Sequence, residues 1–493
     1  MSRPRGELAI VLHTHMPYVE GFGTWPFGEE WLWRCVAESY LRLEGVLSAA
    51  PLTVGVTPVL ADQFEAMRGA AGDRMLGFYS DSREYVYDED MRSMTQVGEP
   101  ELSDALAPQL ADYRRAAARF EEIGRDLNAL IASFARDGSA QLLGGPATHP
   151  VMPLLATDFG LDLQLRVGAE SHARRFGSGA GIWLPECAYD PSLDTALHRN
   201  GVDYFCLART EQLGIDSLDN LTPVQLPGGP VAVPIDWRSI DIVWDEQGMP
   251  GAAAYRSSFK RSIHSLMAWN NEGVAWDLAA ARAQADRHAD EFLAAVGDRL
   301  DAYRADRGES GLCTFAIDTE LLGHWWYEGP WWLEAVCARA AGTGIELVTL
   351  ETALSRRQPP AATPARSSWG ADKDLSTWDS PPVADYAWQQ RAAELELHDL
   401  LGHDAGIAES PAALRAAREL LAMQASDWAF IAKRETAGDY AADRFAGHLA
   451  AFQRAVAALR QSADRGGHGP DAEIYGLSPG LTNELLAELR CAH

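Results

Sequence analysis

The sequence predicts an α/β protein built around a parallel barrel. Short apolar runs, typical of buried strands, recur along the first 350 residues. Most of them are separated by stretches with helical spacing, so strand followed by helix repeats seven or eight times and favours a closed or nearly closed barrel over an open sheet. The expected strands are residues 8–12, 52–57, 140–143, 181–185, 204–207, 231–235, 312–317 and 345–348, and the expected helices are 29–47, 191–198, 276–303 and 331–341.

Two regions depart from this alternation. Residues 102–136 are rich in Ala, Leu, Arg and Glu and are longer than a barrel crossover needs, so we expect a helical insertion near 100–137. Residues 356–368 contain three prolines and resemble a linker, and only helical patterns follow, at 386–401, 411–424 and 438–459. We therefore expect a barrel domain over 1–360 and an α-helical domain over 361–493 that contributes to the active-site cleft.

Composition narrows the class of partner. The 493 residues include 42 Lys and Arg against 70 Asp and Glu, a net charge of −28, which argues against nucleic acid and against an anionic membrane surface. A neutral substrate is not repelled. The six cysteines lack zinc or redox spacing, and no stretch reads as a signal peptide or membrane span, so we expect a cytoplasmic protein. The sequence does not indicate an oligomeric state.

Polar side chains follow four of the predicted strands directly. Because the carboxyl ends of parallel barrel strands share one mouth, these side chains are expected to meet there. They are His13 and His15 after the first strand, His149 after the third, Glu186 after the fourth and Asp318 after the seventh.

Glu186 and Asp318 are the candidate catalytic pair. Two carboxylates facing a common mouth are what glycosidic bond chemistry needs, one to attack the anomeric carbon and one to protonate the leaving oxygen. Either residue alone could instead cap the following helix or pair with an arginine. Their matched placement at two strand ends favours catalysis.

Tryptophan is unusually abundant, with 16 residues against 15 Phe and 14 Tyr. An indole ring stacks on the apolar face of a sugar, while a neighbouring histidine reaches a hydroxyl. Four indoles follow Asp318 closely; Trp331 and Trp332 fall in a predicted helix and are expected to pack in the core. The remaining candidates for sugar contact are His324, Trp325 and Trp326 in the loop, and Trp369, Asp427 and Trp428 in the last domain.

The histidines also allow a metal interpretation, with His13, His15, His149 and Asp318 as ligands. Against it, the sequence has no His-Glu-x-x-His spacing and no cysteine pair. We therefore rank hydroxyl recognition above metal binding.

Six motifs, spread in order over nearly the whole chain, resemble those of glycoside hydrolase family 57, and most closely those of its 1,4-α-glucan branching enzymes. They are residues 12–19 (LHTHMPYV), 147–149 (ATH), 183–189 (WLPECAY), 318–330 (DTELLGHWWYEGP), 368–370 (SWG) and 424–428 (QASDW).

The resemblance implies an incomplete (β/α)₇ barrel with helical additions, a retaining mechanism and no metal or other cofactor. It implies Glu186 as the nucleophile and Asp318 as the acid/base, on an α-glucan such as amylose or glycogen. It also implies that His13, Trp269, Trp369 and Asp427 contact the glucan. The segment after the sixth predicted strand departs from the branching pattern, because it reaches Val243 through a short loop whose single aromatic residue is Trp237. A short loop admits more water to the glycosyl-enzyme, which favours hydrolysis over transfer.

Three alternatives to a branching enzyme stay open. An α-amylase or 4-α-glucanotransferase of the same family fits the short loop. A metal-dependent carbohydrate hydrolase or deacetylase would use His13, His15 and His149 as ligands. A glycan-binding protein without turnover would need only the aromatic residues.

Overall fold

The computed structural model describes residues 4–24, 27–245, 248–403, 405–465 and 476–492. All eight predicted strands are present, and one further two-residue strand, β6, lies antiparallel to β7. The strands are β1 (Gly6–Thr14), β2 (Leu52–Val56), β3 (Ala140–Leu143), β4 (Gly181–Ile182), β5 (Tyr204–Leu207), β6 (Val224–Gln225), β7 (Val231–Pro234), β8 (Leu312–Asp318) and β9 (Ile345–Leu347).

The strands form two sheets, parallel except for β6, that meet at two seams. One sheet runs β3-β2-β1-β8, with β9 beside the first residues of β1, and the other runs β4-β5-β7-β6. A parallel bridge between Gly144 and Ile182 joins β3 to β4, and the Asp236 N–H donates to the Thr314 carbonyl at 2.8 Å, which joins β7 to β8. Seven parallel strands thus follow one another around a barrel that these seams close only partly, which confirms the predicted fold class.

Burial explains why these segments form strands. Every residue of β1 is buried, as expected for a barrel strand covered on both faces. At the seam between β7 and β8, Asp236 is fully buried and pairs with Arg299 of α12 (Leu278–Arg307) at 2.6 Å. A buried carboxylate with a guanidinium partner fixes the seam, because leaving either charge alone would be costly.

The helices alternate with the strands as predicted, but the helix expected at 29–47 is broken. It ends at Glu38, and a 3₁₀ turn, η1 (Tyr40–Leu43), follows before α2 begins. The barrel helices are α1 (Glu29–Glu38), α2 (Glu44–Ala49), α3 (Pro58–Ala66), α7 (Leu127–Arg136), α8 (Asp158–Phe176), α9 (Asp194–Arg199), α10 (Thr210–Leu213), α11 (Trp237–Val243), α12 (Leu278–Arg307), α13 (Gly329–Arg339) and α14 (Leu350–Ser355). The Ser39 hydroxyl at the break donates to the Thr319 carbonyl at 2.9 Å, which ties the break to the end of β8.

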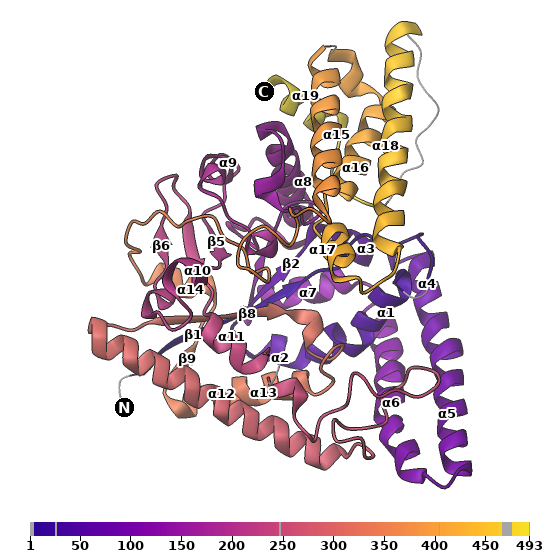
Figure 1. Cartoon of the computed structure of the whole chain (residues 1–493), viewed down its shortest axis with the longest axis vertical. Helices are drawn as coiled ribbons and strands as arrows, with labels where there is room; N and C mark the ends of the chain where they lie inside the picture. The colour runs from indigo at the N-terminus through magenta and orange to yellow at the C-terminus, as the bar shows by residue number, and fades with distance from the viewer. Residues whose placement is uncertain (1–3, 25–26, 246–247, 404, 466–475, 493) are drawn as a thin grey trace.

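Inserted helices occupy a longer stretch than the predicted 100–137. They begin with α4 (Ala70–Gly77), continue through a π-helical turn (Phe78–Arg83) into α5 (Glu84–Gln96), and end with α6 (Pro100–Glu122). The earlier helices escaped prediction because their exposed faces carry Asp, Arg, Ser and Glu in place of the Ala and Leu that mark α6. In Figure 1, α5 and α6 lie side by side and extend away from the barrel.

The last part of the chain is helical. The three predicted helices are confirmed, and two shorter ones, α17 and α19, join them; the set is α15 (Ala384–His403), α16 (Pro411–Met423), α17 (Asp427–Arg434), α18 (Tyr440–Arg465) and α19 (Asn483–Ala492). In Figure 1, α15, α16, α18 and α19 stand together at one end of the molecule, and α17 lies at their base, next to the barrel. Their shared apolar core extends onto α8 of the barrel through Phe159, Leu163 and Val167.

No helix in the described ranges combines the length and the apolar character needed to cross a membrane.

Candidate active site

The barrel brings the predicted rim residues together. His13 and Asp318 are paired neighbours at the ends of β1 and β8. His149 and Glu186 follow β3 and β4, with 3.8 Å between His149 Nδ1 and Glu186 Oε1. Glu186 also lies close enough to Asp318 for its charge to act on that carboxyl group.

Glu186 occupies an unusual backbone conformation. Its φ is 59° and its ψ 17°, the left-handed region that a residue with a side chain rarely adopts, and Cys187 follows at φ 46°. The Trp369 N–H donates to the Glu186 carbonyl at 2.9 Å and holds this turn in place. Such backbone strain concentrates at functional sites, where the surrounding structure maintains it.

Two donors orient the Glu186 carboxylate. Ser426 Oγ donates to Oε1 at 2.7 Å, and the indole Nε1–H of Trp369 donates to Oε2 at 2.8 Å. Burial raises the pKa of Glu186, while these two hydrogen bonds oppose the rise by stabilising the carboxylate. Both donors come from chain beyond the barrel strands, so the C-terminal region completes the site.

Asp318 has a different environment. Its side chain is exposed at the end of β8, and none of the hydrogen bonds found in the described residues reaches its carboxylate. Neighbouring protein atoms displace part of the water around the carboxyl group and raise its pKa well above the usual range, and the negative charges of Glu320 and Glu186 raise it further. A pair of carboxyl groups whose environments push their pKa values apart is how one acid and one base are assigned. Here the pKa of Asp318 is the more strongly raised of the two, which suits it to the role of the acid.

The three histidines form a stacked group beside the carboxylates. His15 Nε2 lies 3.0 Å from Asp427 Oδ2, and its Nδ1 lies 3.1 Å from Thr57 Oγ1. Burial lowers the pKa of His15, but Asp427, Glu320 and Glu186 together outweigh this effect and the net shift is upward. Burial and the neighbouring His15 hold the pKa values of His13 and His149 well below normal. His15 is therefore the member of the group that gains a proton most readily, and it pairs with Asp427.

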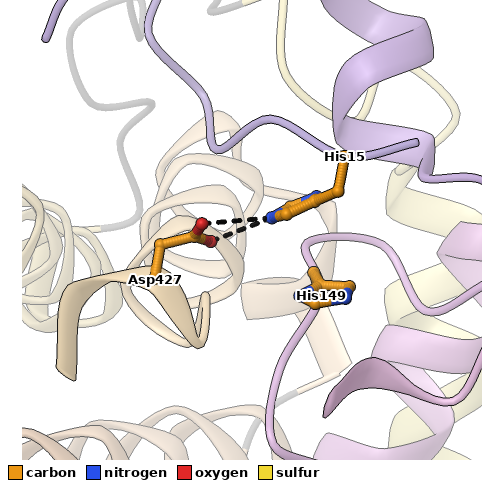
Figure 2. A group of neighbouring side chains, drawn as sticks. All are labelled: His15, His149 and Asp427. Atoms are coloured by element: carbon orange, nitrogen blue, oxygen red, sulfur yellow. Dashed lines mark hydrogen bonds and ion pairs between the residues drawn. The ribbon is translucent and has the colours of Figure 1, made fainter. Parts of the chain in front are cut away.

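This geometry does not suit a metal ion. Ligand atoms of His15, His149 and Asp427 lie within 4.8 Å of one another, but the two imidazoles are stacked 4.0 Å apart at 22°. Figure 2 shows the edge of His15 pointing at Asp427 while His149 lies against its face. A ring nitrogen presents its lone pair in the ring plane, so two stacked rings cannot both direct a lone pair at one ion. Both nitrogens of His149 are also engaged, with His13 and Ser426.

Glu320 is a member of the site that the sequence analysis did not single out. It is buried and accepts hydrogen bonds from the Tyr40 hydroxyl at 2.5 Å and from the His15 N–H at 3.2 Å. Burial raises the pKa of Glu320 to about 7. It therefore takes up a proton near neutral pH, beside Asp318.

Replacing Glu320 by Gln is expected to change how stability depends on pH. In the native protein the free energy of unfolding should fall as the pH rises from 4.5 to about 7, because the raised pKa favours the protonated folded form. The fall should be roughly 3 kcal/mol at most. Glu320→Gln should remove this part of the pH dependence, measured by urea unfolding at pH 5 and pH 8. Equal pH dependence in the two proteins would contradict the assignment.

The predicted sugar-contacting aromatic residues divide into two groups. Trp369 belongs to the site through its bond to Glu186 and its edge contact with His13, with ring centroids 6.3 Å apart. Trp325 is 52% exposed and Trp269 is half-buried beneath the Lys260 ammonium group, 4.9 Å from the ring centroid. Their roles in binding stay predictions.

Three others are buried and have packing or hydrogen-bonding partners inside the protein, and their roles in sugar binding also stay predictions. Trp326 is 2% exposed and packs between Tyr255 and Trp332. Trp428 is 1% exposed and its indole N–H donates to the Ala422 carbonyl inside the helical domain. His324 is buried, with Nδ1 2.5 Å from Glu38 Oε2. In each case tertiary packing uses a side chain whose sequence neighbours suggested a binding role.

Trp237 does not lie in a loop either. It is the first residue of α11, so the short segment after β7 forms a helix. The Lys373 ammonium lies 3.1 Å from the centroid of its ring. Burial lowers the pKa of Lys373 to about 8.

Replacing Trp326 by Ala should destabilise the protein by about 3–5 kcal/mol, the usual cost of removing a buried indole. Urea unfolding at neutral pH measures the loss. The matched change Trp325→Ala, in the exposed neighbour, should leave stability nearly unchanged. An unaltered stability of Trp326→Ala together with a raised KM would restore the sugar-contact role.

The comparisons with known proteins agree with this geometry. The family model described as "Glycosyl hydrolase family 57" matches residues 9–365. The chain belongs to this family. A second family model, "1,4-alpha-glucan branching enzyme, C-terminal", matches residues 391–466. The protein is thus a glycoside hydrolase family enzyme. The two family models together match the barrel and the C-terminal helical region.

The relatives align with nearly the whole length of this chain. A probable 1,4-α-glucan branching enzyme of Mycobacterium tuberculosis is 30% identical over 524 aligned residues, covering 98% of this chain and 97% of the relative. The crystal structure of a family 57 branching enzyme from Pyrococcus horikoshii is 28% identical with a TM-score of 0.87, covering 98% and 94% of the two chains. A branching enzyme from Thermococcus kodakaraensis, crystallised with glucose, is 26% identical with a TM-score of 0.85 and the same coverage.

Proposed function

We propose that this family 57 enzyme is a retaining 1,4-α-glucan branching enzyme, which cuts an α-1,4-linked chain and rejoins it as an α-1,6 branch. The observation that supports it most is the pair of carboxyl groups at the ends of two barrel strands, with Glu186 held by two donors and the pKa of Asp318 raised well above its usual range. The printed names of the relatives support the branching reaction in particular.

The first half-reaction breaks the α-1,4 bond. The ionised Glu186 attacks the anomeric carbon and forms a glucosyl ester, while Asp318 gives its proton to the departing 4-oxygen. Asp318 suits this role because its pKa is raised well above the usual range. The oriented carboxylate of Glu186 and the carboxylic acid of Asp318, whose pKa is raised, provide the two groups that the step needs.

The second half-reaction forms the branch. Asp318, now ionised, takes the proton from the 6-hydroxyl of an acceptor glucose, whose oxygen attacks the anomeric carbon and releases Glu186. Water can take the place of this hydroxyl, and the product is then a hydrolysed chain. The ratio of the two outcomes depends on how well the site excludes water.

The groups around the carboxylates suit a neutral polysaccharide such as amylose or glycogen. Asp427 and His15 form a polar pair that can bind hydroxyls, and the exposed Trp325 offers a ring to a sugar face. The net charge of −28 does not oppose a neutral chain. None of the six cysteines, all within the described residues, is in a disulfide, which supports a reducing, cytoplasmic setting.

The closest alternative is an α-amylase or 4-α-glucanotransferase. The specific observation in its favour is α11, a short helix of seven residues that follows β7 and whose aromatic residue Trp237 is covered by Lys373. A segment this short covers less of the glucosyl ester and leaves it more accessible to water. We therefore expect some of the glucosyl ester to be hydrolysed and not transferred to an acceptor.

Product analysis on amylose tests the proposal. We expect α-1,6 anomeric protons to accumulate in the NMR spectrum, with fewer new reducing ends than new branches. Reducing ends without α-1,6 signals would identify an amylase. Redistributed α-1,4 chain lengths without either change would identify a 4-α-glucanotransferase.

A further inference from the structure

A line of buried hydrogen bonds leads away from Glu186 into the protein. Ser426 Oγ donates to Glu186 Oε1 at 2.7 Å and lies 2.9 Å from His149 Nδ1. His149 Nε2 lies 2.9 Å from His13 Nε2. Ser426, His149 and His13 are 4%, 3% and 1% exposed, so water cannot easily substitute for any of these bonds.

Chemistry fixes the direction of every bond in this line. A serine hydroxyl has one proton, and Ser426 gives it to Glu186, so Ser426 must accept a hydrogen bond from His149 Nδ1–H. A neutral His149 then has a bare Nε2, which must accept from His13 Nε2–H. The line therefore carries its protons toward Glu186 as long as Glu186 is ionised.

The line ends at His13 Nδ1. This nitrogen is buried and has no hydrogen-bond partner in the described part of the chain. One face of the His13 ring stacks on Trp183 at 4.6 Å, and Gly55, its register partner in β2, offers no side chain to Nδ1. With Glu186 ionised, Nδ1 carries only a lone pair.

Protonating Glu186 at Oε1, the oxygen bonded to Ser426, would reverse the line. Glu186 could then donate to Ser426, Ser426 to His149 and His149 to His13, which would place an N–H on His13 Nδ1. A buried N–H without an acceptor is among the rarest features of native proteins, and a bare acceptor is tolerated better. The closed end at His13 therefore works against the protonated form of Glu186.

We propose that Ser426, held by His149 and His13, is a positioning residue that keeps the carboxylate of Glu186 ionised and fixed for attack. This inference rests on the proposed role of Glu186 as the nucleophile. Ser426 precedes α17 directly, so the helical part of the chain controls the ionisation of a carboxylate that the barrel supplies.

Other charged groups also face Glu186, and the experiment must separate their effects. They are His15 after β1, Asp427 of α17 and Asp318 of β8. His15 stabilises the Glu186 carboxylate, Asp427 opposes it, and Asp318 opposes it only while it is ionised. None of them is bonded to Ser426 in the described structure, so removing the Ser426 hydroxyl leaves their contacts in place.

The test compares Ser426→Ala with the unchanged protein and with Ser133→Ala, which removes a hydroxyl bonded to the Leu130 carbonyl in α7. The acidic limb of kcat/KM on amylose, measured from pH 4 to pH 8, reports the titration of the free enzyme's base. We expect Ser426→Ala to move this limb up by about one pH unit, a tenfold loss at its acidic end. Ser133→Ala should leave the limb unmoved. A limb that stays in place in Ser426→Ala would overturn the inference.

A second measurement reads the histidine tautomers directly and does not depend on the activity of any variant. Nitrogen-15 NMR of histidine-labelled protein at pH 7, assigned with His149→Gln and His13→Gln, should show His149 protonated at Nδ1 and His13 at Nε2. His149 protonated at Nε2 would also overturn the inference. The proposed function is tested independently by Glu186→Gln, and retained activity of that variant on amylose would contradict it.

Discussion

Glu186→Gln is expected to lose roughly 10⁴–10⁶ of the kcat on amylose, the scale seen when the nucleophile of a covalent mechanism is removed. An amide has the shape of the carboxylate but cannot form the glucosyl ester. Ser426 and Trp369, which donate to the two oxygens of Glu186, hold the side chain in its turn, and at least one of these bonds survives in the amide. Maltoheptaose affinity, measured by calorimetry, should therefore stay within a few-fold of the native value.

The control is Glu211→Gln, an exposed glutamate in α10, which should retain full activity. Retained activity in Glu186→Gln would show that Glu186 is not the nucleophile. If the native protein itself binds oligosaccharides but turns over no α-glucan, the glycan-binding alternative gains support.

Asp318→Asn is expected to produce the second largest effect, a loss of about 10²–10⁴ on amylose, the usual contribution of a general acid. An aryl glucoside whose phenol leaves without protonation should lose much less in the first step. Because partial loss of water and the carboxylates of Glu320, Glu186 and Asp427 raise the pKa of Asp318, the native enzyme should lose activity as the pH rises and that proton is removed. The basic limb of the pH profile should disappear in Asp318→Asn.

Asp104→Asn, an exposed aspartate in α6, serves as the matched control and should keep both activity and pH profile. Equal losses of Asp318→Asn on amylose and on the activated aryl glucoside would contradict the acid role. Such a result would indicate that Asp318 stabilises charge or binds sugar in both steps.

The barrel could be predicted because its strands are local features. Each is a short run of buried apolar residues, and the polar residue that ends it, such as Asp318 after β8, needs no knowledge of distant contacts. The break after Glu38 could not be predicted in this way. It depends on Ser39 reaching the Thr319 carbonyl, a contact between residues 280 positions apart.

Residue roles were hardest to predict where neighbours in sequence face opposite directions. Trp325 is 52% exposed and Trp326 is 2% exposed, although the loop sequence treats them alike. Ser426 and Glu320 were missed because a serine before a helix and a glutamate after a strand are common. Only the fold reveals that one bonds Glu186 and the other bonds Tyr40.

Trapping the covalent intermediate tests the central claim most directly. A 5-fluoro-α-glucosyl fluoride reacts with a retaining nucleophile but leaves a slowly hydrolysed ester, because its ring fluorine destabilises the oxocarbenium-like transition state. After digestion and mass spectrometry, we expect one fluoroglucosyl label, on the peptide that contains Glu186, and none in Glu186→Gln. A label on another carboxylate, or an inverted anomer released without any label, would contradict the account.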